Sequence, residues 1–295
     1  MKSKFSRRSA LRKLAGSALA LAAASSLPPR LQAAQSAGPV KLKGRIKQSV
    51  CRWCYGKIPL DQLCDAAKEM GLLSIDLMEV QDFPTLEKHG LICAMVSGVP
   101  GGITQGLNRP QNHERIARFM EQTIPIVAEH GYPNIICFSG NRNGMPDSQG
   151  MENCLVGLKA IVPVAEKHKV TVCMELLNSK HDHKDYMCDH SAWGVELCQR
   201  VGSEYFKLLY DIYHMQIMEG DLITTIRDNH ACLAHFHTGG VPGRGEIDDT
   251  QETCYPAVMR AIADCGFKGF VAQEFVPKRP DALASLKQCV QICDV

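Results

Sequence analysis

The chain has 295 residues, of which 45% are hydrophobic and 22% charged, so its composition is that of an ordinary globular protein. Its formal net charge of +2 comes from the N-terminus, where residues 1–37 hold seven basic residues and no acidic one. The rest of the chain has 26 Lys and Arg against 31 Asp and Glu, which argues against a nucleic-acid partner.

Residues 1–37 have the pattern of an export signal. Arg7 and Arg8 precede a mildly apolar, alanine-rich run at 14–27, which is too short to span a membrane. Paired arginines before such a run are typical of twin-arginine signals, although a basic tail without a targeting role is the alternative. We therefore expect export to the periplasm by the twin-arginine machinery, cleavage between about Ala33 and Ala37, no stable membrane insertion, and one domain over residues 38–295.

Fourteen cysteines in an exported protein suggest a disulfide framework. However, Cys93, Cys137, Cys173 and Cys232 fall in predicted strands, where free cysteine behaves as a small hydrophobic residue. The Cys-x-x-Cys pair at 51–54 ends a strand instead of opening a helix. We therefore expect neither a disulfide framework, nor a redox pair, nor a structural zinc site.

After residue 40, short apolar segments alternate with longer amphipathic ones. The predicted strands cover residues 46–51, 72–79, 91–98, 134–140, 170–178, 206–214, 232–240 and 269–275. The predicted helices cover residues 60–71, a short piece ending near 89–90, 113–131, 150–168, 192–202, 221–230, 255–266 and 281–293. Eight such units predict an α/β fold with a parallel sheet closed into a single-domain (β/α)8 TIM barrel. A doubly wound open sheet is the alternative, but no G-x-G-x-x-G loop follows the first strand.

Polar side chains lie at the ends of the last four predicted strands. In chain order they are Glu175, Asp211, His237 and Glu274. Because the carboxyl ends of barrel strands form one rim, we expect these four side chains to meet there. Clustered carboxylates repel one another and lose hydration unless a cation compensates them. Three carboxylates and one imidazole suit Mn²⁺, which we expect, with Mg²⁺ or Co²⁺ as alternatives.

Structural interpretations of the same histidines and acids stay open. Asp211 follows a strand and would serve as a helix N-cap, and His214 would be a half-buried histidine or would orient a neighbouring site residue. We expect His235 and His237 to point to opposite faces of their strand, so that only one faces the barrel centre. We take this to be His237, because it lies nearer the end of the strand, and expect His235 to be a packed or surface-layer histidine.

Four residues near the expected rim are weaker candidates. Trp53 and Tyr55, just past the first strand, would form an apolar wall over a ligand or simply pack. His181 and His183 lie in a polar segment, and we expect them to be solvated loop residues with a role in a lid at most.

Four segments, in order, resemble the hydroxypyruvate isomerase branch of the xylose isomerase-like barrels, a superfamily of sugar isomerases and epimerases. They are MELLN, YDIYHMQ, HFHTGGVPGRGEID and AQEFVP, and the resemblance covers residues 45–293. It implies the metal ligands Glu175, Asp211, His237 and Glu274, with Glu175 and Glu274 also forming the acid–base pair. It further implies substrate contacts from His214, Arg244 and Glu79. One departure is that hydroxypyruvate isomerases often carry Gln at the position of His237, where epimerase-like members have His.

The resemblance implies a metal-dependent isomerase that interconverts an aldose and a ketose, or hydroxy-keto acids, by proton transfer through an enediolate. A ketose 3-epimerase, or a lyase or dehydratase acting on a sugar derivative, would use the same step. A periplasmic sugar-binding protein without turnover is the alternative from another class. The implied partners are a small sugar or hydroxy-keto acid and further copies of this chain in a homo-oligomer. The export signal is a second departure, because hydroxypyruvate is a cytoplasmic metabolite.

Overall fold

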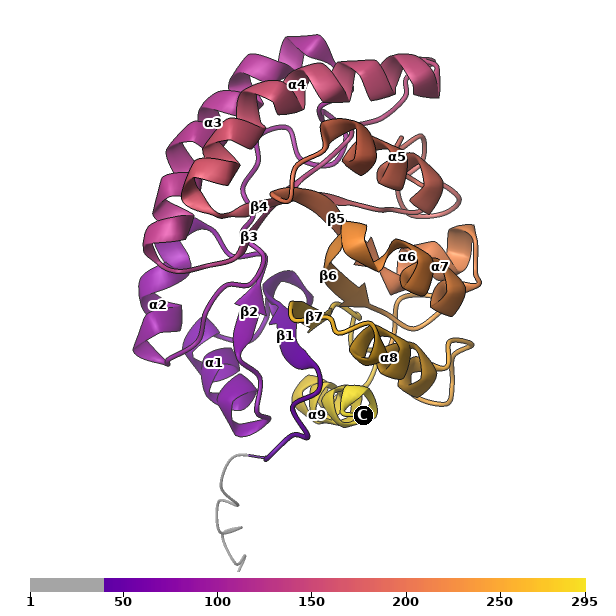
Figure 1. Ribbon diagram of the computed structural model, residues 1–295. Helices are drawn as coiled ribbons and strands as arrows, with labels where there is room; N and C mark the ends of the chain where they lie inside the picture. Colours follow the sequence, from indigo (N-terminus) through magenta and orange to yellow (C-terminus); the bar gives the residue numbers. More distant parts are fainter. Residues whose placement is uncertain (1–39) are drawn as a thin grey trace, which may run out of the picture. The chain divides into compact units, whose positions relative to one another are not determined.

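A computed structural model describes residues 40–295, so the predicted signal at 1–37 lies outside the described residues. Seven parallel strands are hydrogen-bonded in the order β2-β1-β7-β6-β5-β4-β3 (Figure 1). The strands are β1 Lys47–Cys51, β2 Ser74–Asp76, β3 Asn134–Cys137, β4 Thr171–Glu175, β5 Phe206–Asp211, β6 Leu233–Thr238 and β7 Phe270–Gln273.

The segment between β2 and β3 closes the sheet into a barrel. Parallel bridges join Ile92 to Ser74 of β2 and Val96 to Met78 just past β2, and a further bridge joins Val96 to Ile135 of β3. Leu77, directly after β2, has a φ of 60°, so the extended backbone is interrupted between β2 and Met78. The (β/α)8 prediction is thus confirmed, although the strand predicted at 91–98 forms only these bridges.

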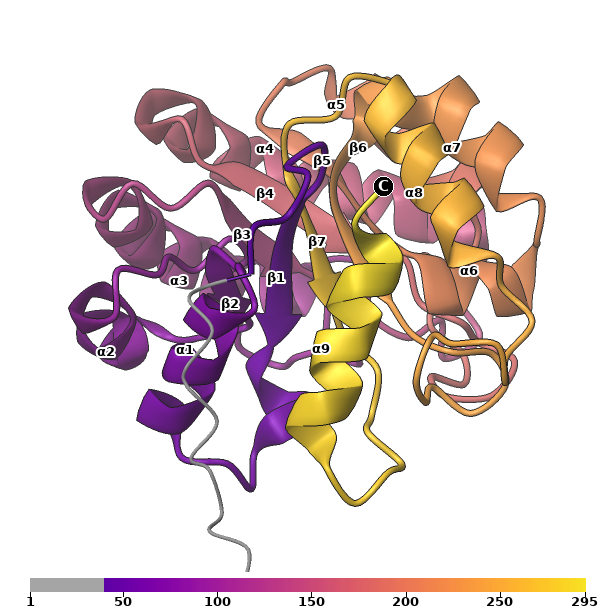
Figure 2. The ribbon, with the colours of Figure 1, turned by 90° about the horizontal axis from the view of Figure 1, so that it is seen from below.

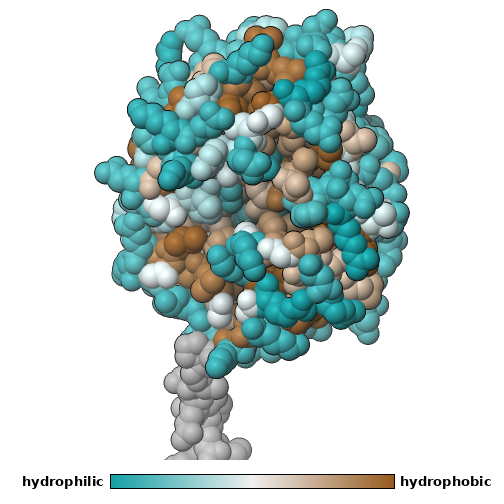
Figure 3. All heavy atoms as spheres, in the orientation of Figure 1, coloured by the Kyte–Doolittle hydropathy of each residue, from teal (hydrophilic) through white to brown (hydrophobic). Residues whose placement is uncertain are grey.

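Helices surround the strands on the outside, as two perpendicular views show (Figure 1 and Figure 2). The helices are α1 Leu60–Glu69, α2 Phe83–Lys88, α3 Pro110–Glu129, α4 Asp147–His168, α5 Ser191–Val201, α6 Ile212–Met218, α7 Leu222–Asn229, α8 Tyr255–Asp264 and α9 Ala282–Cys293. Short 3-10 turns are η1 Arg52–Tyr55, η2 Val80–Asp82 and η3 His230–Cys232. Polar side chains dominate much of the outer surface, with apolar patches toward the middle of the face in view (Figure 3). Among residues 40–295, no helix has the length and apolar character that crossing a membrane would require.

Helix α6 corrects the strand predicted at 206–214. The strand ends at Asp211, and His214 lies inside the helix. The Asp211 side chain accepts hydrogen bonds from the backbone N–H groups of Tyr213 and His214 at 2.8 and 3.2 Å. A side-chain cap satisfies N–H groups that the first turn of a helix leaves free, so the chain turns from strand to helix at this residue.

The barrel has an apolar layer inside as well as a core between strands and helices. Met95, Ile136, Cys173 and Leu209 form a separate inner cluster. Alternate residues of a strand share a face, so Cys173 and Leu209 point inward with the residues two positions later, Glu175 and Asp211. The charged end of the barrel therefore rests on a packed apolar layer.

Both His235 and His237 point into the barrel, so the expectation that only His237 would do so is wrong. Residues two apart lie on the same face of a strand, and the two ring centroids are 5.2 Å apart. His235 Nε2 lies 2.7 Å from an oxygen of Asp76, and both side chains are fully buried.

Close backbone contact at Gly106 holds the loop that follows the bridging segment (residues 92–96) against the end of β3. Leu107 N donates to Phe138 O at 3.0 Å, and Asn108 N donates to Ser139 O at 2.8 Å. A Cβ atom at position 106 would lie 2.2 Å from Phe138 O and 2.4 Å from Gly140 N. These are backbone atoms of the β3 end, so they cannot move aside as a flexible side chain would.

We expect Gly106→Ala to lower the free energy of unfolding by about 1–3 kcal/mol because the added methyl group overpacks this contact. Urea unfolding followed by circular dichroism would measure the loss. Gly56→Ala is the matched control, since a Cβ there meets only Trp53 O at 3.6 Å. Equal stability of the two variants would contradict the prediction.

Candidate active site

The four side chains predicted at the strand ends lie together. Glu175 ends β4, Asp211 ends β5, His237 lies in β6, and Glu274 directly follows β7. Asp211 and His237 are paired residues in the β5–β6 ladder, which places them side by side. One ligand atom from each of the four residues lies within 4.8 Å of the other three, and all four are buried.

His237 Nδ1 lies between two carboxylates. It is 2.8 Å from Glu274 Oε2 and 3.2 Å from Glu175 Oε1. This nitrogen is buried, yet it makes no hydrogen bond of acceptable geometry. A buried ring nitrogen that faces carboxylate oxygens without bonding to them has the arrangement of ligands around a shared cation, so these residues fit a metal ion.

Arg244 packs against the same carboxylates. Its Nη2 atom donates to Glu274 Oε2 at 2.5 Å and to Asp211 Oδ2 at 3.2 Å. Its guanidinium carbon lies 5.2 Å from the ring centroids of Trp53 and Tyr213. With all three carboxylates ionised and the imidazole neutral, as ligands of a cation would be, the guanidinium would leave two negative charges for a divalent cation to neutralise.

The pKa values of the three acids in this cluster shift in different directions. Burial raises the pKa of Asp211 to about 8, although Arg244 opposes the shift. Burial also raises the pKa of Glu175. Burial acts on Glu274 in the same direction, but the charges of Arg244 and His237 outweigh it and hold the pKa of Glu274 well below its usual value. The closest ion pair therefore decides which carboxylate stays ionised.

Each oxygen of Asp211 has its own role. Oδ1 accepts the capping hydrogen bonds of α6, and Oδ2 faces Arg244 and the cluster. The helix-cap interpretation of this residue is therefore confirmed, and Oδ2 is still available to the carboxylate cluster.

His214 is fully buried behind the cluster, and its tautomer follows from Asn178. Asn178 Oδ1 accepts the backbone N–H groups of residues 181 and 182, so its amide nitrogen faces His214 Nδ1 at 2.6 Å. His214 Nδ1 must then accept, and the ring proton lies on Nε2, 3.5 Å from Asp211 Oδ2. Arg244 Nη1, 3.2 Å from Nε2, is then a neighbour of the N–H group and not a donor to it. Burial holds the pKa of His214 well below its usual value, so the ring is neutral.

A cavity of about 540 Å³ opens beside the cluster. Its volume lies within the range of small-molecule sites. Its polar lining comes from Glu175, Glu274, Arg244, His183, Ser97 and Thr104, and its apolar lining from Trp53, Leu77, Val99, Ile103, Ile136, Phe138 and Leu177. The two glutamates and the arginine therefore face a cavity of the size of a small-molecule site.

Trp53 does more than form the wall that the sequence suggested. It is 49% exposed at the cavity, and its Nε1–H donates to Glu274 Oε1 at 2.7 Å. Tyr55 is buried and packs edge-on against Phe275, so it takes the packing role.

Two other expectations have different outcomes. Glu79 is exposed at the start of η2, where it pairs with Asp82 in a capping box, and it does not line the cavity. His183, a half-buried loop residue, lines the cavity, and its ring lies 5.2 Å from that of His214, so the expectation of a loop residue with a lid role at most stays a prediction. A loop has no hydrophobic periodicity, so the sequence held no signal for the place of His183. Asn178 was also missed, although its position three residues after Glu175 in MELLN was visible.

The family model for the xylose isomerase-like TIM barrel matches residues 63–290. The chain therefore belongs to this family, in agreement with the resemblance and with the observed fold.

Individual relatives are isomerases and epimerases. A Homo sapiens protein named "Putative hydroxypyruvate isomerase" is 27% identical over 260 residues, which cover 86% of this chain and 85% of that protein. A 2-oxo-tetronate isomerase of Cupriavidus necator is 32% identical over 109 residues, 37% of this chain and 41% of that one. The crystal structure of D-psicose 3-epimerase in the presence of D-fructose matches with a TM-score of 0.65 at 17% identity, over 84% of this chain and 90% of that one. The structural match shows a shared fold, and the sequence relatives support an enzyme of this kind.

Glu246 fixes the loop that carries Arg244. Its Oε1 atom accepts hydrogen bonds from Lys278 N at 3.0 Å, Arg279 N at 3.2 Å and Ser285 Oγ at 2.8 Å. Burial acts to raise the pKa of Glu246, but these hydrogen bonds outweigh it and hold the pKa below its usual value. The carboxylate thus stabilises the fold at any pH above the pKa of the unfolded chain, and this contribution is lost as the pH falls through the folded-state pKa.

We expect Glu246→Gln to lower the free energy of unfolding at pH 7 by about 1–2 kcal/mol, because a charged acceptor is replaced by a neutral one. The difference from wild type should shrink as the pH falls below about 4, where glutamate protonates. Urea unfolding at pH 7 and at a pH below about 4 would measure this difference. Glu69→Gln, at an exposed position, is the control, and a pH-independent difference for Glu246→Gln would contradict the assignment.

Proposed function

We propose that this protein is a divalent-metal-dependent isomerase of the hydroxypyruvate isomerase type, which interconverts an aldose and a ketose or hydroxy-keto acids. The observation that carries the proposal is the buried group of three carboxylates and one imidazole, with ligand atoms within 4.8 Å of one another. The adjoining cavity and the isomerase relatives support it.

Glu175, Asp211, His237 and Glu274 would hold the metal, and their oxygen-rich set favours Mn²⁺, with Mg²⁺ or Co²⁺ as alternatives. When bound, the ion would act as a Lewis acid that stabilises negative charge on the carbonyl and adjacent hydroxyl oxygens of the substrate.

The protein side chains would move the proton. Glu175 and Glu274 both line the cavity, so one can take a proton from the carbon beside the carbonyl and the other can return one. Trp53 on Oε1 and Arg244 on Oε2 fix the orientation of the Glu274 carboxylate. Arg244 also faces the cavity, where it would bind a carboxylate or hydroxyl group of the substrate. The apolar wall formed by residues such as Ile136 and Phe138 would keep water from the reacting carbon.

A ketose 3-epimerase is the second candidate. It needs the same proton removal, with return to the opposite face. His237 favours it, because epimerase-like members carry His at this position where hydroxypyruvate isomerases often carry Gln. The substrate screen must therefore include ketoses as well as hydroxypyruvate.

We expect Mn²⁺-loaded protein to exchange a substrate C–H for solvent deuterium, and a chelator to abolish this exchange. Glu175→Gln and Glu274→Gln should each lower the rate by about 10²–10⁴-fold, because each removes an acid–base group. Proton NMR of hydroxypyruvate and ketoses in deuterated buffer would measure the exchange. Glu121→Gln, on the exposed surface of α3, is the matched control.

Trp53 offers a binding readout that does not depend on turnover. The chain has two tryptophans, so in Trp193→Phe only Trp53 remains, hydrogen-bonded to a proposed ligand. Mn²⁺ should quench its fluorescence, and adding Glu175→Gln should weaken this effect at least about tenfold, in line with loss of a metal ligand. If every added divalent ion failed to produce either quenching or exchange, the proposal would be refuted. Sugar binding without exchange would instead favour the binding protein.

We also infer that the chain is exported, on the strength of the paired arginines at the N-terminus. Full-length protein made in a bacterium with a twin-arginine system should appear in the periplasmic fraction in a shortened form. Arg7→Lys with Arg8→Lys should leave it unprocessed in the cytoplasm, and equal export of both proteins would contradict the inference.

A further inference from the structure

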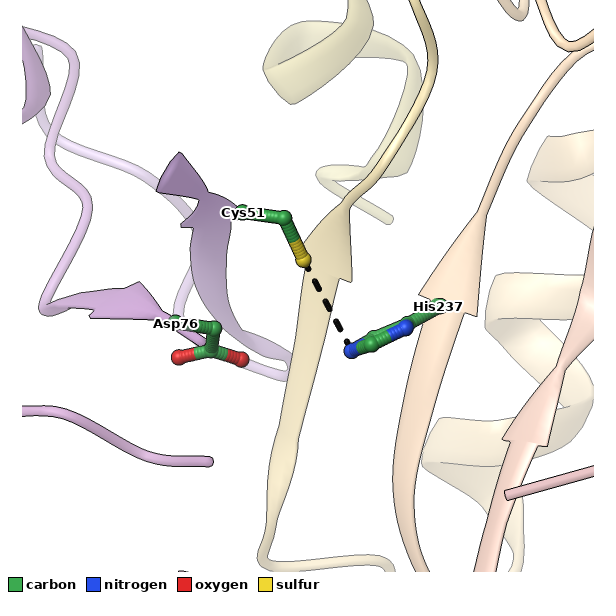
Figure 4. Close-up of side chains that lie close together, drawn as sticks. All are labelled: Cys51, Asp76 and His237. Atoms are coloured by element: carbon green, nitrogen blue, oxygen red, sulfur yellow. Dashed lines mark hydrogen bonds between the residues drawn. The ribbon is translucent and has the colours of Figure 1, made fainter. Parts of the chain in front are cut away.

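A second group of ligand-type side chains lies deeper in the barrel. Cys51 ends β1, Asp76 ends β2, and both point toward His237 on β6 (Figure 4). All three side chains are fully buried, and one ligand atom from each lies within 4.8 Å of the other two. Of these residues, only His237 belongs to the carboxylate cluster.

The distances suit a cation that binds sulfur. Cys51 Sγ lies 3.7 Å from His237 Nε2. Ligand bonds of roughly 2.3 Å to sulfur and 2.0 Å to nitrogen at a tetrahedral angle give a sulfur–nitrogen separation of about 3.5 Å. The pair therefore needs only a small shift to hold one ion.

Asp76 supplies a buried oxygen whose close neighbour is His235. Its Oδ1 atom accepts from Ser49 Oγ at 2.6 Å and from Ser74 Oγ at 2.7 Å. Its Oδ2 atom makes no hydrogen bond, although His235 Nε2 lies 2.7 Å away. The His235 nitrogens likewise have no hydrogen-bond partner. Oδ2 is therefore close to His235 but is not held by a well-aligned hydrogen bond, which leaves it able to bind an ion.

We propose that Cys51, Asp76 and His237 form a second cation site, which takes a thiophilic divalent ion such as Zn²⁺. Binding would release the Cys51 thiol proton to solvent, because the thiolate is the metal ligand. One thiolate and one carboxylate then neutralise the two positive charges of the ion, which a buried site requires. Sulfur and imidazole ligands favour Zn²⁺ or Co²⁺, whereas the oxygen-rich cluster favours Mn²⁺ or Mg²⁺.

The two sites share a single imidazole ring. His237 Nδ1 faces Glu175 and Glu274, and Nε2 faces Cys51. A neutral imidazole has one N–H, so only one of its nitrogens can ligate at a time. An ion on Nε2 would leave the ring proton on Nδ1, directed at the carboxylates, and would withdraw His237 from the other site. Thiophilic ions should therefore inhibit the enzyme. This consequence rests on the proposed function, whereas the site itself does not.

Cobalt binding to the metal-free full-length protein tests the site directly, because thiolate-bound Co²⁺ has an intense near-ultraviolet charge-transfer band. We expect the band in wild type and in Cys137→Ala, a buried strand cysteine outside both ligand groups. It should be absent in Cys51→Ala, and Asp76→Asn should weaken Co²⁺ binding at least about tenfold. Circular dichroism would verify that each variant is folded. Absence of the band in wild type, or its persistence in folded Cys51→Ala, would overturn the proposal.

Inhibition tests the competition between the sites. Zn²⁺ should inhibit Mn²⁺-supported deuterium exchange in wild type. In Cys51→Ala the inhibition constant of Zn²⁺ should be at least about tenfold larger. Each protein is compared with its own rate without Zn²⁺. A Cys51-dependent cobalt band without any exchange would leave the second site standing and refute the proposed function. Equal zinc inhibition of both proteins would refute the competition.

Discussion

Charge compensation among buried carboxylates is the constraint on which this site depends. Glu175, Asp211 and Glu274 are brought to one end of a closed sheet, where little water is available to solvate them. Arg244 compensates part of their charge through Asp211 and Glu274, and a divalent ion would compensate the rest. The surroundings follow from this need, because aromatic rings enclose the arginine and Glu246 fixes its loop.

Strand parity explains how one barrel interior can hold two polar groups. Each inward-facing residue is followed two positions later by another, so Cys173 and Glu175, or His235 and His237, form successive layers. The later layer carries the carboxylate cluster. The earlier one is apolar on the β3–β5 side, and it places His235 beside Asp76 on the other. The same regular geometry thus produces a carboxylate-lined rim and a buried polar group beneath it.

The strand-end pattern made the barrel and the four clustered residues predictable, because hydrophobic periodicity and the ends of parallel strands follow local rules. The strand predicted at 91–98 was harder to define, since only isolated bridges join it to its neighbours and the adjacent backbone turns at Leu77. The place of His183 at the cavity was not predicted, because the path of a loop determines it. The contacts of Trp53 with Glu274 and of Asn178 with His214 join distant parts of the chain, and no local pattern encodes such pairs.

The indole of Trp53 links access to the cavity with the orientation and basicity of Glu274 behind it. The ring is half exposed, covers Arg244 with its face and holds Glu274 through its N–H group. A ligand that displaced the ring on entry would remove one hydrogen bond from the carboxylate, which would then be freer to turn and more basic. Return of the ring would restore that bond and cover the arginine again. Substrate entry, product release and the proton affinity of the glutamate would then change together, with one side chain acting as the gate.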